Sequence, residues 1–180
     1  LYLFWELTSV FSFLLIGFNY EKRSSRRAAG QAFITTTFGG LAMLVGIITL
    51  GNIPGGSYSL VELLESAKSG TLGVASITAN STPSGVITAA VVLILIGAMA
   101  KSAIMPFHFW LPAAMAAPTP TSAYLHAAAM VKAGVYLVAR LAPGFSDIAA
   151  WRWMVLIGGI GTLLLGGYRA LKQNDLKLVL

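Results

Sequence analysis

The sequence predicts an all-α protein, a polytopic transmembrane helical bundle of about five spans with the start of a sixth. Of its 180 residues, 57% are hydrophobic and 10% are charged, whereas a soluble domain carries about 25% charged residues. Apolar runs long enough to cross a bilayer, about 20 residues each, recur along the chain. The net charge of +6 does not indicate nucleic acid binding, because the basic residues adjoin these runs and form no docking face.

The first two expected spans flank a basic loop. The first span covers residues 1–18 and is interrupted by Glu6 and by small polar residues. Residues 19–27 form the loop and contain a lysine and three arginines. The second span covers residues 28–51, where Gly39-Gly40 and a run of threonines favour close helix packing within lipid. Because the chain begins inside an apolar run, we expect it to be a segment of a longer protein.

Residues 52–83 are polar and rich in glycine, serine and threonine, which predicts an extracytoplasmic loop. Within this loop, Ser59 and Glu62 have the spacing of a capping box and are followed by leucines. We therefore expect a short helix over residues 59–68, lying at the membrane surface.

The third expected span, 84–112, contains a helix break. It is purely apolar from 86 to 100, reaches Lys101, and then contains Pro106. Proline removes a backbone donor and clashes with the preceding turn, which predicts a broken helix near Pro106. A broken helix inside a bilayer needs polar partners or water for its backbone groups.

Two further spans follow a Pro- and Thr-rich breaker at residues 116–121. The fourth span covers residues 122–141 and contains His126 and Lys132, and the fifth covers residues 149–171 and is rich in glycine. A sixth span begins near residue 176, where Asp175 is placed to cap the helix start.

The orientation follows from Lys and Arg in the short loops, which face the cytoplasm. The loop after the first span and the turn after the fifth are the most basic, and both face the same side if each run crosses once. An extra crossing between 106 and 121 would invert the last turn and break this rule.

Three charged residues lie deep in apolar runs, where a charge costs about 2.5–3.5 kcal/mol or more. They are Glu6, Lys101 and Lys132. Glu6 is also compatible with a position near the interface at a helix end, and Lys101 with snorkelling to the interface. Because residues 84–100 are short for a crossing, we interpret Lys101 as buried beside a hydrated break, where the pKa of a lysine changes readily.

Two histidines have different expected roles. His126 lies six residues before Lys132, about 240° around a helix, so the two side chains cannot share a face. Histidine at this depth suits either a proton relay or a structural hydrogen bond. Lys132 is too far from the ends of its span to snorkel easily. His108 has no second ligand at metal spacing, and we expect it to hydrogen-bond the broken backbone.

The motifs that mark enzymes are absent from the sequence. It has no cysteine, no nucleophile triad, no phosphate-binding loop and no quinone, haem or flavin motif. We therefore expect no cofactor, no metal site and no catalytic chemistry beyond the movement of ions.

A long motif connects the chain to a family. The stretch 101–140, KSAIMPFHFWLPAAMAAPTPTSAYLHAAAMVKAGVYLVAR, resembles the proton-conducting membrane subunits shared by Mrp-type cation/proton antiporters and NADH-quinone oxidoreductase. FWELTSVFSFLLIGF and ALKQNDLKLVL are similar to other blocks of that family in the same order. PFHFWLP, AMAAPTP and HAAAMVKAGVYLVAR are most similar to the large antiporter-like membrane protein, Mrp A, of Mrp-type Na+/H+ antiporters.

The resemblance implies an antiporter-like unit with two inverted repeats. In it, Glu6 pairs with Lys101 and tunes the pKa of that lysine, and His126 and Lys132 are the next proton stations. It implies other membrane subunits of a multi-subunit antiporter as partners, protons and monovalent cations such as Na+ as substrates, and a multi-pass location in a bacterial plasma membrane. Ile104 departs from the glutamine frequent in the family, which removes a water-holding group beside Lys101.

Three functions remain open at this point. The first is cation/proton antiport, and the second is a proton-pumping membrane subunit of an NADH-quinone oxidoreductase, in which electron transfer elsewhere drives the same residues. The third is a non-conducting scaffold whose charges are paired for packing alone. The third would be favoured if Lys101→Ala left ion transport unchanged.

Overall fold

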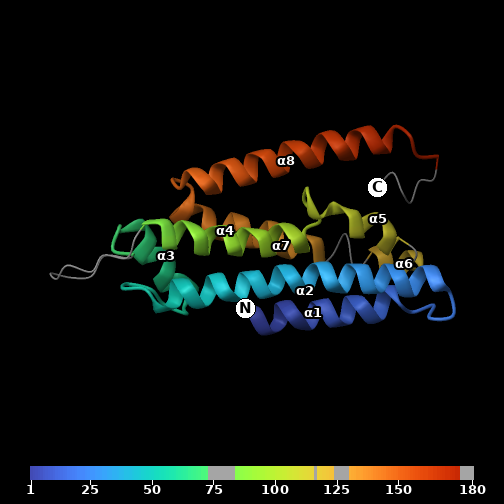
Figure 1. The fold of residues 1–180 in the computed structure, drawn as a ribbon, viewed down its shortest axis with the longest axis horizontal. Helices are drawn as coiled ribbons and strands as arrows, with labels where there is room; N and C mark the ends of the chain where they lie inside the picture. Colours follow the sequence, from blue (N-terminus) through green and yellow to red (C-terminus); the bar gives the residue numbers. More distant parts are fainter. Residues whose placement is uncertain (73–83, 116, 124–129, 175–180) are drawn as a thin grey trace.

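The computed structural model describes residues 1–72, 84–115, 117–123 and 130–174, and these residues form helices and no strand. The all-α prediction is therefore confirmed. The helices lie side by side in an elongated bundle (Figure 1). Their bounds are α1 Tyr2–Ile16, α2 Arg23–Asn52, α3 Leu60–Lys68, α4 Ser84–Lys101, the 3-10 helix η1 Phe107–Phe109, α5 Trp110–Ala114, α6 Thr119–Ala123, α7 Met130–Phe145 and α8 Ala149–Ala170.

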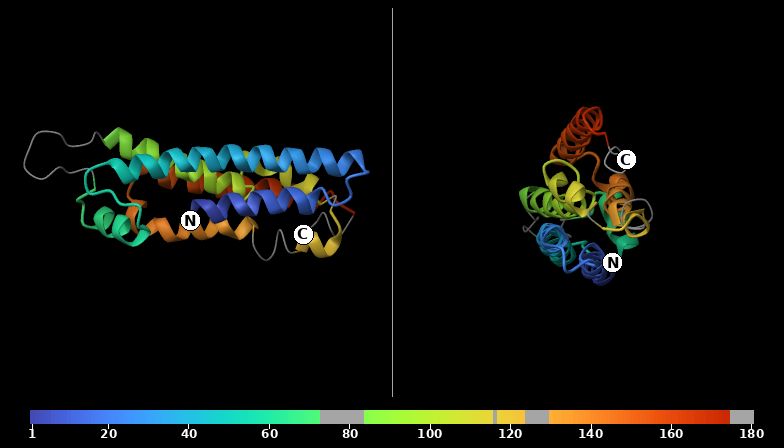
Figure 2. Two further views of the ribbon diagram at one scale, coloured as in Figure 1. Left: turned by 90° about the horizontal axis from the view of Figure 1, so that it is seen from below. Right: turned by 90° about the vertical axis from the view of Figure 1, so that its right-hand side faces the viewer.

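The helices differ in their capacity to cross a bilayer. Among the described residues, α2 with 30 residues and α8 with 22 are long and apolar enough to span one. α1 and the segment Gly85–Lys101 of α4 are shorter apolar helices. Viewed end-on, α4 and α7 lie between α8 on one side and the α1–α2 pair on the other (Figure 2).

Small residues bring α2 and α4 into close contact along their length. A Cβ added to Gly97 would lie 2.6 Å from the Cβ of Met43, and one added to Gly46 would lie 2.6 Å from the carbonyl oxygen of Ala90. A Cβ added to Gly39 would overlap Ala100. The close packing expected at Gly39 is thus present, because glycine lets two helix backbones approach where a side chain would hold them apart. We call this contact the α2–α4 seam.

Basic residues gather at one end of the bundle. The loop between α1 and α2 and the C-terminal end of α8 lie at the same end, opposite α3 and the connection between α7 and α8 (Figure 1). α2 begins at Arg23 rather than at residue 28, so three arginines occupy its first turns. Arg26 donates hydrogen bonds to the carbonyl oxygens of Tyr20 and Glu21, which ties this loop to the helix start.

The short helix α3 forms at the expected place, but its capping pattern differs. The Ser59 side chain makes no capping hydrogen bond. Instead, the hydroxyl of Ser57 donates to the carboxylate of Glu62 at 2.6 Å and accepts from the N–H of Ser59 at 3.0 Å. The capping-box prediction was therefore wrong about the serine, because the loop places Ser57 rather than Ser59 over the first turn.

α4 ends at Lys101, ahead of the break expected near Pro106. Ala103 has φ +52°, a left-handed conformation that side chains other than glycine rarely adopt, and the Met105–Pro106 peptide is cis. The chain then continues through η1 into α5. The turn therefore leaves Lys101 as the last helical residue.

The expected fourth span differs from the structure in two respects. Residues Thr119–Ala123 form the short α6, and α7 begins at Met130 and runs through Pro143 to Phe145, past the end expected at residue 141. Residues 124–129, which include His126, and residues 175–180, which include Asp175 and the expected sixth span, lie outside the described residues.

Candidate functional site

Lys101 is the centre of the candidate site. Its side chain is 0% exposed, although it ends an apolar helix. It extends from α4 to α1, where its Nζ donates hydrogen bonds to the carbonyl oxygen of Trp5 at 2.9 Å and to the hydroxyl of Ser9 at 2.6 Å. The Nζ also lies 5.4 Å from the centroid of the Trp5 ring, within the range of a cation–π contact. An ammonium is thus held inside the bundle by neutral groups.

Glu6 follows Trp5 on α1 and brings a carboxylate into the same region. It is close enough to Lys101 for an electrostatic interaction, but the two side chains form no direct ion pair. Its Oε1 is buried without a hydrogen-bond partner and lies against Gly40 of α2, where an added Cβ would overlap it. The Gly39-Gly40 pair therefore serves two contacts, one with α4 and one with the Glu6 carboxylate.

Other polar atoms near this carboxylate also lack partners. Among the described residues, the hydroxyl of Thr37 and the Nε1 of Trp5 are buried and make no hydrogen bond. Thr37 lies one turn before Gly40, on the same face of α2. An unpartnered buried polar group costs about 1–3 kcal/mol, and stability alone does not explain several of them beside a buried ammonium.

The turn after Lys101 is held by side chains from two later helices. The hydroxyl of Ser102 donates to the carbonyl oxygen of Val131 in α7 at 2.7 Å. The N–H of Met105 donates to the hydroxyl of Thr162 in α8 at 2.9 Å, and that hydroxyl donates to the carbonyl of Gly158 at 2.6 Å. These bonds satisfy backbone groups that a continuous helix would have paired internally.

Trp110 of α5 holds the last turn of α4. Its side chain is 0% exposed, and its Nε1 donates to the carbonyl oxygen of Ala100 at 3.0 Å. This carbonyl belongs to the residue next to Lys101 and lies among the final four of α4, which have no partner within the helix. Trp110 thus fixes the backbone from which the Lys101 side chain extends.

Lys132 lies elsewhere. It is exposed on α7, on the face that also carries the exposed Val135 and Tyr136, whereas Gly134 and Leu137 lie on the buried face. The structure therefore does not bring Lys132 together with Lys101. His126 lies outside the described residues.

The expectation for His108 was wrong. Its Nδ1 is buried without a partner, and within the described part of the chain its side chain makes no hydrogen bond to the broken backbone. The reason is that Trp110, Ser102 and Thr162 bind backbone groups around the turn instead.

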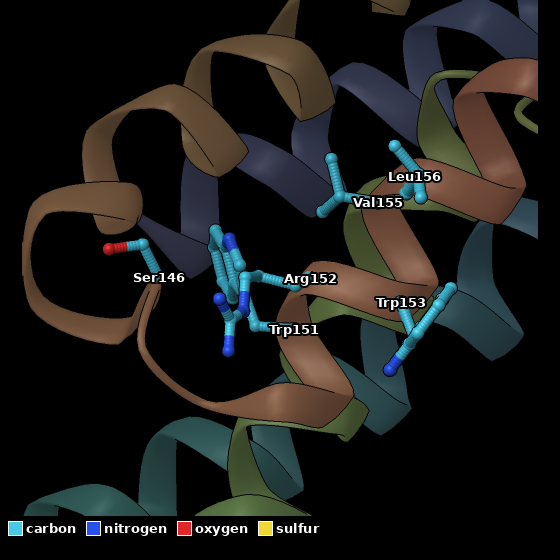
Figure 3. A pocket seen from close by; sticks show the side chains of 6 residues that line it. All are labelled: Ser146, Trp151, Arg152, Trp153, Val155 and Leu156. Carbon is cyan, nitrogen blue, oxygen red and sulfur yellow. The ribbon is translucent and has the colours of Figure 1, made fainter.

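The described residues contain no group of three or more His, Cys, Asp or Glu side chains that could hold a metal ion. A cavity of about 560 Å³ lies where α7 connects to α8 (Figure 3). Its lining includes one charged side chain, Arg152, beside Trp151 and Trp153. It is open and largely apolar and is separate from the Lys101 site.

Sequence reasoning missed Ser9, which binds Lys101 directly. A signal was present, because Ser9 follows Glu6 by three residues and therefore lies on the same face of α1. It missed Thr162 and Trp110 as well, because their partners are main-chain groups of another element and leave no pattern in the sequence.

Comparison with known proteins gives the same family throughout. The family described as NADH:quinone oxidoreductase/Mrp antiporter, TM, matches residues 1–180. A Na(+)/H(+) antiporter protein of Bacillus subtilis, named as the A component of its complex, is 46% identical over 180 residues, which are 100% of this chain and 21% of that protein. The corresponding A1 component of a Na(+)/H(+) antiporter from Staphylococcus saprophyticus is 48% identical, with the same coverage of each chain.

A relative from Rhizobium meliloti has a different cation in its name. It is named as the probable A/B component of a K(+)/H(+) antiporter and is 50% identical over 174 residues, 97% of this chain and 16% of that protein. The chain thus spans about a fifth of the length of the curated relatives it matches.

Proposed function

Because this chain belongs to the NADH:quinone oxidoreductase/Mrp antiporter transmembrane family, we propose that it carries part of the proton path of a monovalent cation/proton antiporter. The full-length protein would exchange Na+ or another monovalent cation for H+. The names of the similar proteins support antiport, and both Na+ and K+ appear in them.

One observation carries the proposal: a lysine that is 0% exposed stands at a helix break, opposite a carboxylate with an unpartnered oxygen. A charged side chain inside a membrane protein is costly and usually marks an ion or proton path. Lysine suits this task because its protonation state responds strongly to its surroundings. Protonation of Glu6 would remove the negative charge that attracts the ammonium and so favour proton release from Lys101.

His126 and Lys132 are the proposed next stations of the path. Lys132 faces outward from α7, so its partners would come from parts of the protein beyond this chain. The exit side of the path belongs to those parts as well.

The proposed topology has about five crossings, with α4, η1 and α5 together forming one interrupted crossing. The basic end of the bundle would face the cytoplasm of a bacterium, by the excess of Lys and Arg there. The relatives are named as subunits, which supports a multi-subunit complex with other membrane proteins in the plasma membrane.

A proton-pumping role in an NADH-quinone oxidoreductase is the alternative, because the same family includes such proteins. The two functions differ in what drives the path. Proton movement coupled to a Na+ or K+ gradient without NADH supports antiport, whereas proton movement that requires NADH oxidation supports the alternative.

The test uses the full-length protein with its partner subunits in everted vesicles from an antiporter-deficient bacterium. Addition of Na+ or K+ to acidified vesicles should release protons, measured by the recovery of a pH-sensitive dye. Lys101→Ala and Glu6→Gln should each lower the exchange rate more than about 10-fold, a change of about 1.4 kcal/mol in the barrier.

Lys172→Ala is the matched control, because Lys172 is an exposed lysine near the end of α8 that lies over the Tyr168 ring. It should leave the exchange rate within about twofold of wild type. Unchanged exchange in Lys101→Ala vesicles that contain normal amounts of protein would refute the proposed path and favour a scaffold role.

A further inference from the structure

Ser9 is the polar side chain closest to the proposed proton carrier. Its hydroxyl lies 2.6 Å from the Nζ of Lys101, and the Ser9 side chain is 1% exposed. It also donates a long hydrogen bond of 3.4 Å to the carbonyl of Trp5, the second acceptor of the Lys101 Nζ. One turn of α1 thus provides a hydroxyl, a carbonyl and an aromatic face around one ammonium. We call this group the α1 cradle.

The α1 cradle has a chemical property that the Glu6 carboxylate lacks. A serine hydroxyl both donates and accepts hydrogen bonds, so it can accept from –NH3+ and donate to –NH2. The Trp5 carbonyl accepts from either form of the lysine. An ionised carboxylate only accepts, and its attraction is strongest for the charged form. The cradle therefore suits a lysine that changes its protonation state without moving away.

We propose that Ser9 is a positioning residue that holds the Lys101 amine on α1 in both protonation states, so that Lys101 can lose and regain its proton without leaving the path. This inference rests on the proposed function. It goes beyond the Glu6–Lys101 interaction, because it assigns the lysine a second, uncharged partner on the same helix.

Few other charged groups face Lys101 within the described residues. From α1, Glu6 interacts with it electrostatically, and Tyr2 interacts with Glu6 in turn. α2 contributes the uncharged Gly39-Gly40 region, α5 contributes Trp110, and Lys132 of α7 is exposed on the far face. The charged residues of α8 are Arg152 and Arg169, near its two ends. A change at Ser9 should therefore act on the Lys101–Glu6 interaction rather than on a wider network.

The experiment compares Ser9→Ala with Ser9→Thr in the full-length complex, again in everted vesicles. Ser9→Ala removes the hydroxyl, so the ammonium loses an acceptor and the protonated lysine becomes less favoured. We expect exchange at neutral pH to fall by about three- to tenfold, and the alkaline limb of the rate-against-pH curve to move to lower pH by about half a unit or more. Ser9→Thr keeps a hydroxyl and should restore both the rate and the curve in large part.

Thr36→Val is the matched control for the loss of a buried hydroxyl. Thr36 is 1% exposed, and its hydroxyl donates only to carbonyls of its own helix. It should leave the pH curve in place. Protein amounts in the vesicles, measured by immunoblot, normalise all rates.

Two outcomes would overturn the inference. One is a Ser9→Ala protein with the wild-type rate and pH curve. The other is equal loss in Ser9→Ala and Ser9→Thr with no movement of the curve, which would assign Ser9 to packing alone. Either result with Lys101→Ala still inactive rejects only the role of Ser9, whereas unchanged exchange in Lys101→Ala rejects the proposed function itself.

Discussion

Two lysines stand in apolar helices of this chain, and the structure treats them in opposite ways. Lys101 at the end of α4 is 0% exposed and binds a carbonyl, a hydroxyl and an aromatic face of α1. Lys132 in α7 is exposed and makes no hydrogen bond or ion pair within the described residues. This segment therefore contains the complete setting of one lysine and leaves the setting of the other to the remainder of the protein.

The largest expected effect tests this contrast directly. Lys101→Met and Lys132→Met both remove a charge while keeping a long, flexible side chain. Lys101→Met should lower cation/proton exchange more than about 10-fold, because every partner on α1 loses its ligand. Lys132→Met should have a smaller effect on exchange, measured in the same vesicles at equal protein amounts. An equal or larger loss from Lys132→Met would show that the outward-facing lysine limits the path.

A smaller effect is expected from crowding the carboxylate that faces Lys101. Gly40→Ala places a Cβ where the Oε1 of Glu6 now lies, so the carboxylate must move. Exchange should fall about three- to tenfold, equivalent to about 1 kcal/mol in the barrier. Gly30→Ala is the control on the same helix, because an added Cβ there meets nothing within 4 Å. Identical rates for the two variants would mean that the position of Glu6 is unimportant.

The support behind Lys101 can be weakened through Trp110. Trp110→Phe leaves the Ala100 carbonyl without its donor, which should cost about 1–3 kcal/mol of stability. The purified complex should unfold at a lower temperature in a thermal scan. Trp153→Phe provides a comparison, because Trp153 is 61% exposed on α8. If both variants unfold at the same temperature, the bond from Trp110 contributes nothing measurable.

The smallest expected effect concerns the turn itself. Thr162→Val removes the acceptor of the Met105 N–H, a loss of about 1 kcal/mol that is local to the turn. The Met105 amide should then exchange with deuterium faster than in wild type, while Thr162→Ser should retain protection. Thr49→Val, which removes a hydroxyl bonded only within α2, should not change that amide. Unaltered exchange in Thr162→Val would mean that another group protects Met105.

The sequence was sufficient to locate the charged residues but not to orient them. Glu6, Lys101 and Lys132 were identified because charges in apolar runs are costly, and that argument depends only on depth along a span. Which way each side chain faces depends on where neighbouring helices pack. For Lys101 the break turns the last residue of α4 toward α1, and for Lys132 the buried face of α7 is defined by Gly134 and Leu137.

The supporting residues were harder to predict for a related reason. Ser9, Thr162 and Trp110 act through single hydrogen bonds to groups outside their own helices. Serine and threonine are common in membrane helices, where they also bond to their own backbone, as Thr36 does here. Their partners become visible only when the helices are assembled. The all-helical class, by contrast, follows from composition and run length alone.

The α2–α4 seam has a mechanical consequence for the proposed transport cycle. Because Gly39, Gly46 and Gly97 place the two backbones in direct contact, a one-turn slide of α4 along α2 would press Met43 and Ala90 into the facing helix. The pair therefore behaves as one stiff strut that carries Lys101 at a fixed height. Changes that open or close a route past Lys101 must come from side-chain rotation, from α1, or from the turn that follows. A covalent link between α2 and α4 should accordingly leave turnover intact, whereas a link between α1 and α4 should stop it.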